Sequence, residues 1–202
     1  MRAATTLAVT LAATAAAPAV ADATTTSYKL IEASGTHRVT FTADKATCAR
    51  FLTCGYRGTI TYKFGGTPSG RLVLEQGSNG HVTGAADFTS RVTTVADVTA
   101  GAACDDTVRH AREHFSMRSP SRLGKLIFGL HGAKTDYLAT DCAGPTEADL
   151  KRDAALPTGR FKREDFKAQS TTFGLKGSAA FREKGYRGTT TWNLSYEVKR
   201  RR

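Results

Sequence analysis

The pentapeptide Gly-Tyr-Arg-Gly-Thr occurs twice in this 202-residue chain, at Gly55–Thr59 and at Gly185–Thr189. Each copy precedes a segment in which apolar and polar residues alternate with a period of two. This pattern is typical of a β-strand that is buried on one face only. After the first copy, the residues predicted to face inward are Ile60, Tyr62 and Phe64. The chain must therefore form at least two half-buried strands that begin at the same turn sequence.

The second copy continues the same register. Trp192 and Leu194 take the places of Tyr62 and Phe64 at a constant offset of 130 residues, and Tyr196 and Val198 extend the same face. Upstream, "TFT" at 40–42 and "TFG" at 172–174 match if the first copy carries two extra residues. We therefore predict two related units, each made of a strand, a loop, the Gly-Tyr-Arg-Gly turn and a second strand.

Many short alternating segments separated by Gly, Asn and Pro predict a mainly β fold. The further expected strands lie at 27–34, 37–43, 70–76, 81–99, 124–132 and 134–140, with turns at "GGTPSG" and "GSNG" between several of them. We expect an antiparallel β-sandwich or barrel of two pseudo-repeated half-units. Two short helices are predicted, at 105–117 and 145–155, because each opens with acidic residues in its first turn.

The first 23 residues have the layout of a secretory signal peptide. Arg2 precedes an Ala- and Thr-rich apolar run, and small residues suitable for cleavage follow it. We therefore predict a secreted protein, with residues 24–202 as a single β-rich domain. Beyond residue 23, no apolar run approaches the length of a membrane span.

In an exported protein the four cysteines are expected to form disulfides, because disulfides persist in oxidising compartments. An even set predicts two bridges, and we favour Cys48–Cys54 and Cys104–Cys142 among the three possible pairings. A zinc site is the alternative. It is less favoured because there is no C-x-x-C and the cysteines are widely spaced.

The formal net charge of +11 favours an anionic partner. The basic C-terminal tail, Lys199, Arg200, Arg201 and Arg202, is predicted to project from a sheet edge and to bind polyanions. Arg57 and Arg187, from the two pentapeptides, are weaker contributors. The expected partner is an anionic cell-wall polymer or polysaccharide. A nucleic acid would also suit this charge, but the sequence contains no specific nucleic-acid motif. The alternative is that the charge only keeps the protein soluble.

The stretch His110-Ala111-Arg112-Glu113-His114 fits the pattern H-x-x-E-H. On a helix this spacing places both histidines on one face, where inverted zinc peptidases bind a metal that their glutamate assists. The pattern is short and lacks a clear third ligand, so an amphipathic helix with solvent-facing histidines is the simpler interpretation. His110, Glu113 and His114 are the candidates for a metal site, and no cofactor is predicted.

The segment "TDCAGPTEADL" at 140–150, together with the late "GYRGT" strand and the Ala-rich leader, resembles uncharacterised secreted β-rich proteins of high-GC Gram-positive bacteria. The resemblance implies a bacterial source and an extracellular location, and it assigns no catalytic or binding residue.

These observations favour a secreted non-enzymatic protein that binds anionic surfaces. A small exported hydrolase, metal-dependent through the H-x-x-E-H stretch, is the alternative, and a purely structural envelope protein is a third. The sequence shows no phosphate-binding loop and no G-x-S-x-G nucleophile turn, which disfavours the commonest nucleotide-binding and serine-hydrolase classes.

Overall fold

The computed structural model describes residues 24–43, 57–77, 82–99, 108–119, 121–122, 125–130, 157–183 and 185–201. The strands are β1 (Thr24–Ala43), β2 (Arg57–Gln76), β3 (Val82–Thr99), β4 (Val108–Ser119), β5 (Ser121–Arg122), β6 (Lys125–Leu130), β7 (Thr158–Lys162), β8 (Ser170–Glu183) and β9 (Tyr186–Arg200). The short helix α3 (Arg163–Lys167) lies between β7 and β8. In these described segments, no helix is long and apolar enough to cross a membrane.

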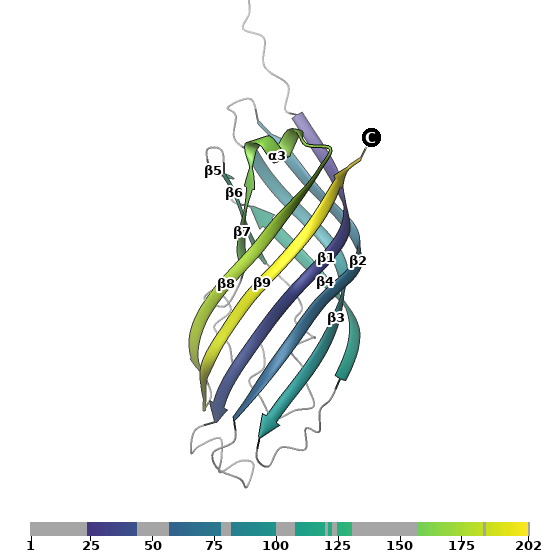
Figure 1. Cartoon of the computed structure of the whole chain (residues 1–202). Helices are drawn as coiled ribbons and strands as arrows, with labels where there is room; N and C mark the ends of the chain where they lie inside the picture. The colour runs from purple at the N-terminus through teal and green to yellow at the C-terminus, as the bar shows by residue number, and fades with distance from the viewer. Residues whose placement is uncertain are drawn as a thin grey trace, which may run out of the picture.

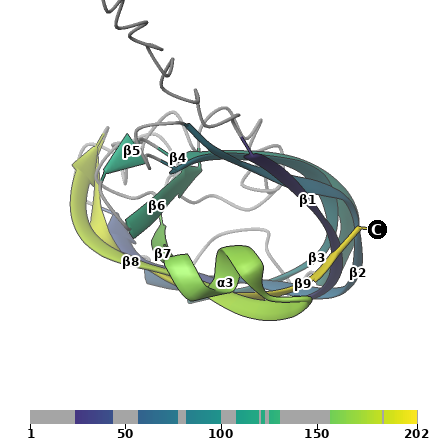
Figure 2. The same cartoon turned by 90° about the horizontal axis from the view of Figure 1, so that it is seen from above.

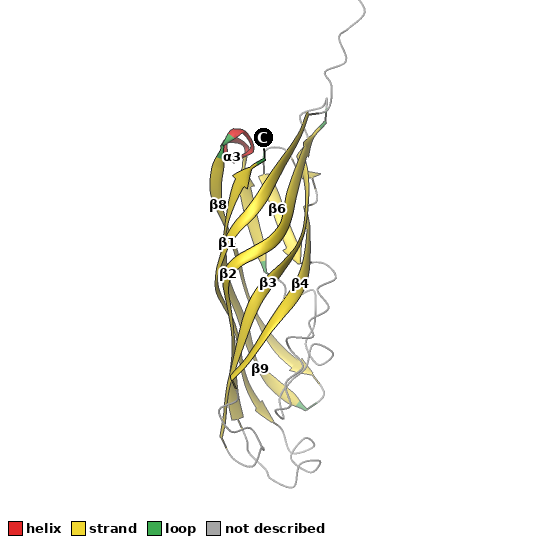
Figure 3. Cartoon of the chain, turned by 90° about the vertical axis from the view of Figure 1, so that its right-hand side faces the viewer, coloured by secondary structure: helices red, strands yellow, loops and turns green. Residues whose placement is uncertain are grey.

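All strands belong to one antiparallel sheet in the order β4-β3-β2-β1-β9-β8-β7-β6-β5 (Figure 1). The sheet curls around a common interior (Figures 2 and 3), and β4 also pairs with β6. The mainly β, antiparallel prediction is therefore confirmed. A single curled sheet takes the place of the two facing sheets of a sandwich.

Ring contacts across the interior account for the curl. Phe88 on β3 packs edge-on against Tyr196 on β9 at a centroid distance of 5.2 Å, although two strands separate β3 from β9 in the sheet. Tyr196 also stacks on Phe173 of β8, and Phe173 contacts Phe161 of β7 at 5.9 Å. Because aromatic side chains bury large apolar areas, these contacts favour a sheet that closes over its own inner face.

Strands β1 and β2 are longer than predicted. The segments 27–34 and 37–43 form one strand, β1, through Gly35, whose φ is +126°. The "GGTPSG" stretch, predicted as a turn, lies inside β2, where the pairing with β3 shifts between Gly65 and Ser69. Turn-forming residues here produce an irregularity in a long strand, because residues on both sides of it continue to pair with β3.

The helix predicted at 105–117 is wrong, because β4 covers most of it. Residues from Val108 onward pair with β3 in continuous antiparallel register, and the hydrogen bonds of the sheet override the local helical pattern. The predicted helix at 145–155, the four cysteines and the leader at 1–23 lie outside the described residues.

Both pentapeptides are found where strands begin, and both strands are neighbours of β1. Phe41 of β1 lies opposite Gly58 of β2 on one side and opposite Gly188 of β9 on the other. In the second hairpin, Gly188 also faces Phe181 of β8. The counterpart of Phe41 is therefore Phe181, and the upstream match to Phe173 is wrong. The two strand pairs that contain the pentapeptides, β1–β2 and β8–β9, lie side by side because β1 pairs with β9.

Three of the five positions of the second pentapeptide have a structural function. Gly185 turns the chain at a φ of +90°, and Tyr186 is buried against Phe41 with their ring centroids 5.8 Å apart. Gly188 has no space for a side chain, because a Cβ there would lie within 2 Å of the Thr40 carbonyl oxygen. Close backbone approach, and not positive φ, therefore requires this second glycine.

We predict that Gly188→Ala destabilises the protein by about 2 kcal/mol or more, because strand β1 or Phe181 must move to accept the methyl group. Gly65→Ala is the matched control: it is another strand glycine, but a Cβ there would meet no atom within 4 Å. Thermal and urea unfolding of both variants measures the difference. Equal stability of the two variants would contradict the packing described for β1 and β9.

Candidate binding surface

The outer face of β2, β1, β9 and β8 has an unusual composition at the end where the pentapeptides lie. Side chains alternate strictly in and out along these strands, so that four strands with four outward positions each form a regular array. We call this array the repeat face. Its positions are Arg57, Thr59, Thr61 and Lys63 on β2; Thr36, Arg38, Thr40 and Thr42 on β1; Arg187, Thr189, Thr191 and Asn193 on β9; and Lys176, Ser178, Ala180 and Arg182 on β8.

The repeat face carries six basic side chains and no acidic one. All sixteen positions are partly or fully exposed, and seven of them are threonine. The nearest acid across the sheet is Asp97 on β3, which lies opposite Thr59. Because the face itself contains no carboxylate, its cations contribute a positive potential on this side of the sheet.

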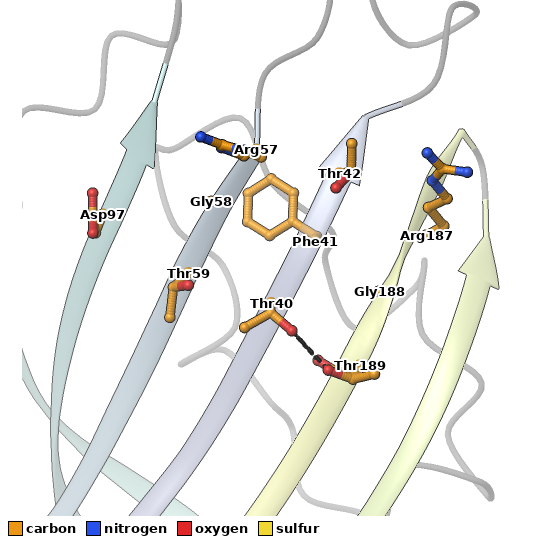
Figure 4. Close-up of a pocket in the computed structure, with 10 residues that line it drawn as sticks. All are labelled: Thr40, Phe41, Thr42, Arg57, Gly58, Thr59, Asp97, Arg187, Gly188 and Thr189. Atoms are coloured by element: carbon orange, nitrogen blue, oxygen red, sulfur yellow. Dashed lines mark hydrogen bonds between the residues drawn. The ribbon is translucent and has the colours of Figure 1, made fainter.

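Three arginines form the end row of the repeat face. Thr42 lies opposite Arg57 on one side and Arg187 on the other, and Arg187 lies opposite Arg182 of β8. Figure 4 shows Arg57 and Arg187 near the ends of the strands that flank β1, with Thr42 between them. Directly opposed like charges destabilise a sheet pair, so the Arg182–Arg187 pair has a cost that the fold does not require.

Threonines occupy the next row. Thr59, Thr40 and Thr189 lie in register, and the hydroxyls of Thr40 and Thr189 are hydrogen-bonded at 2.7 Å (Figure 4). Together with Arg57, Arg187 and the acid Asp97 of β3, they line a surface hollow of about 380 Å³. Guanidinium and hydroxyl groups both donate hydrogen bonds to the oxygens of phosphate, sulfate and carboxylate groups.

A second group of cations lies at the other end of the same strands. Lys29 of β1 is directly opposite Arg71 of β2 and Lys199 of β9, and all three side chains are exposed. We call these three residues the C-terminal row. Arg201 lines two hollows beside it, one of about 600 Å³ with Lys29 and Arg71 and one of about 740 Å³ with Lys199.

The prediction that the basic C-terminus projects from a sheet edge is wrong. Lys199 and Arg200 belong to β9, which lies between β1 and β8 inside the sheet. The Arg200 amide donates to the Gln169 carbonyl at 2.7 Å, and the Arg201 amide donates to the Ser27 carbonyl at 2.8 Å. The backbone is therefore held on both sides up to Arg201.

A pair of acids on β1 and β9 lies between the two basic groups. Glu32 of β1 is opposite Glu197 of β9, one outward position from the C-terminal row along β9. On the other side of Arg71, the directly opposite residue is the acid Asp87 of β3, so the row of basic side chains ends at Arg71. The outer face of β1 and β9 therefore carries two separate basic regions with a carboxylate pair between them.

The structure separates the predicted polyanion-binding residues into two places. Arg57 and Arg187 lie on the repeat face, whereas Lys199, Arg200 and Arg201 lie at the far end of β9; Arg202 is outside the described residues. Sequence reasoning missed the basic residues that only strand pairing brings alongside these: Lys29, Arg38, Lys63, Arg71, Lys176 and Arg182. Their outward parity within alternating strands was the available signal.

The candidate metal residues His110, Glu113 and His114 lie on β4, which is a strand. Two strand positions four residues apart have their Cα atoms about 13 Å apart, whereas one helical turn would bring them to about 6 Å. The helical spacing on which the zinc hypothesis depended is therefore absent.

The interior beneath the repeat face contains a buried histidine in an aromatic stack. His37 of β1 stacks on Trp192 of β9 at a centroid distance of 3.5 Å and on Tyr62 of β2 at 5.2 Å. Its Nε2 atom is 2.5 Å from the hydroxyl of Thr190. Burial lowers the pKa of His37 well below its usual range, so that the ring is held neutral at physiological pH.

Comparison of the chain with family models, with curated proteins and with solved structures finds no match. The geometry above is therefore the basis for any functional assignment.

The buried His37 predicts acid sensitivity. Its pKa is lower in the folded state than in the unfolded state, so the unfolded chain binds the additional proton as pH falls below about 6.5. This single group then removes about 1.4 kcal/mol of stability per pH unit until the folded-state pKa is reached. Urea unfolding from pH 7.5 to 5 measures the slope.

The control for that slope is the double variant His37→Phe with Thr190→Val, which replaces both hydrogen-bonding partners and leaves neither one buried alone. Its pH dependence should be shallower than that of the unmodified protein. Identical slopes in the two proteins would show that His37 is not the group responsible.

The C-terminal row predicts a stability gain on charge removal. Lys29→Gln relieves repulsion with both Arg71 and Lys199, so Tm should rise by about 1–3 °C at low salt and the gain should shrink as salt screens the charges. Lys63→Gln is the control, because Lys63 lies between Thr36 and Thr93 and has no like charge in register. A Tm loss for Lys29→Gln at low salt would contradict the repulsion.

Proposed function

We propose that this is an exported, non-enzymatic β-sheet protein that binds an anionic polymer at the cell exterior through the repeat face. The preferred partner is a cell-wall polymer or an acidic polysaccharide. The observation that carries the proposal is the array of six cations and seven threonines without a carboxylate. Four neighbouring strands present this array on one side of the molecule (Figure 1).

The shape of the surface supports a polymer as the ligand. The array is about 15 Å wide across four strands and about 20 Å long, with outward side chains repeating about every 6.6 Å along each strand. A surface of this extent suits repeated charges along a chain. Several Arg and Lys contacts, each of modest strength, add up on such a ligand and make binding salt-dependent.

The arginine row supports the same assignment. Arg182 and Arg187 lie directly opposite each other and repel one another in the free protein, and a bound anion would offset that repulsion. Surface positions that reduce stability without a packing function are typical of binding sites. The four threonines that line the hollow with Arg57 and Arg187 add hydroxyl donors beside the cations.

A relationship between the two hairpins would explain why equivalent arginines lie on both sides of β1. We propose that β1–β2 and β8–β9 are copies of one pseudo-repeated unit within a barrel. On this view the equivalent arginines, Arg57 and Arg187, flank β1 because the two copies pack side by side through the β1–β9 pairing.

The binding test uses three substitutions inside the array: Arg38→Gln, Lys63→Gln and Lys176→Gln. With oxidised protein and inorganic polyphosphate in about 50 mM salt, we expect the triple variant to bind at least about tenfold more weakly than the unmodified protein, with a smaller loss at about 300 mM salt. Isolated cell wall, tested by cosedimentation, should follow the same order.

The matched control removes the same charge elsewhere through Arg91→Gln, Arg118→Gln and Arg160→Gln, which are exposed positions on β3, β4 and β7. This variant should retain most of the affinity. Equal losses in the two triple variants would mean that only net charge matters, and no binding by the unmodified protein at low salt would rule out the proposed function.

A further inference from the structure

We propose that the C-terminal row is a second contact region for the same ligand, so that one linear polyanion lies lengthwise along β1 and β9 and reaches both basic regions. This inference rests on the proposed function and adds the length and path of the polymer. The observation behind it is that Lys29, Arg71 and Lys199 lie on three of the four strands of the repeat face, toward the opposite ends of those strands.

Strand pairing and backbone hydrogen bonds hold the residues of the C-terminal row in place. Lys29 has a cation directly opposite on each side, and the backbone next to Lys199 is fixed by hydrogen bonds from Arg200 to Gln169 and from Arg201 to Ser27. Ordered backbone of this kind holds three like charges at adjacent sheet positions despite their repulsion. Arg201 adds a fourth cation beside them.

The separation of the two regions sets the ligand length. Thr42 in the arginine row and Lys29 in the C-terminal row are thirteen residues apart on β1, which corresponds to roughly 40 Å of strand. The nearest position of the repeat face on β1, Thr36, is only seven residues from Lys29, about 23 Å of strand, so an oligomer shorter than about 20 Å can occupy only one region at a time. A chain longer than about 40 Å can extend from the arginine row to the C-terminal row, and the second contact then forms at high effective concentration.

The carboxylate pair Glu32 and Glu197 lies on the direct path between the regions. A polyanion that crosses this pair meets repulsion that a short oligomer on either region avoids. Removing the pair should therefore strengthen the binding of long chains only, which is an effect opposite in sign to that of removing cations.

The experiment measures the affinity of the full oxidised protein for linear polyphosphate of graded length, from chains shorter than about 20 Å to chains longer than about 40 Å, at about 50 mM salt. The variant Lys29→Gln, Arg71→Gln, Lys199→Gln tests the C-terminal row, and the Arg91, Arg118, Arg160 triple variant described above controls for net charge. Long chains should bind the control at least about tenfold more tightly than the row variant, because the row variant loses the second contact. Short chains should bind the two variants to within about threefold.

The double variant Glu32→Gln, Glu197→Gln provides the second measurement. Affinity for long chains should rise and affinity for short chains should stay the same. Equal length dependence in the row variant and the control, or a double variant that leaves long-chain binding unchanged, would overturn the lengthwise path while leaving the repeat face as a binding site. Absence of binding at every length would instead overturn the proposed function itself.

Discussion

Strand β1 is the element on which the rest of the structure depends. Its alternation sends Val39 and Phe41 inward and Arg38, Thr40 and Thr42 outward, and it pairs on both sides with strands that begin at the same pentapeptide. A shift of one residue in either pairing would turn every apolar side chain of a strand outward. The register that buries the core therefore also aligns the cations and threonines outside.

The pentapeptide connects folding with surface chemistry. In the second copy, Tyr186 packs against Phe41 in the interior, and Gly188 allows the backbone of β1 to approach closely. Arg187 and Thr189 are left outside, where no packing constraint fixes their identity. A sequence repeated for scaffold reasons thus delivers two equivalent arginines to opposite sides of β1.

The sequence was sufficient for the strands and not for their arrangement. The period of two identified the inward faces of β2 and β9 correctly, because half-buried strands require it. It could not show that Lys29 lies opposite both Arg71 and Lys199, since these pairings join residues more than forty positions apart. The helix expected around His110 failed for the same reason, because pairing with β3 is a long-range effect.

For the candidate site too, the sequence indicates individual residues but not how they are arranged. The pentapeptide marks Arg57 and Arg187 in the sequence. The remaining cations of the repeat face have only their outward parity as a signal, which does not show which strands are neighbours. The C-terminal basic cluster was noticed for its composition, yet its placement inside the sheet comes from the β1–β9 and β8–β9 pairings.

The most direct test of the central claim is an NMR titration of the protein, with threonine methyl groups labelled, against short polyphosphate at low salt. If the repeat face binds the polyanion, the largest shifts will occur at Thr40, Thr59 and Thr189, while Thr83 on β3, which is outward-facing and outside the array, will shift little. Shifts of equal size at Thr83, or shifts confined to residues outside β1, β2, β8 and β9, would contradict it.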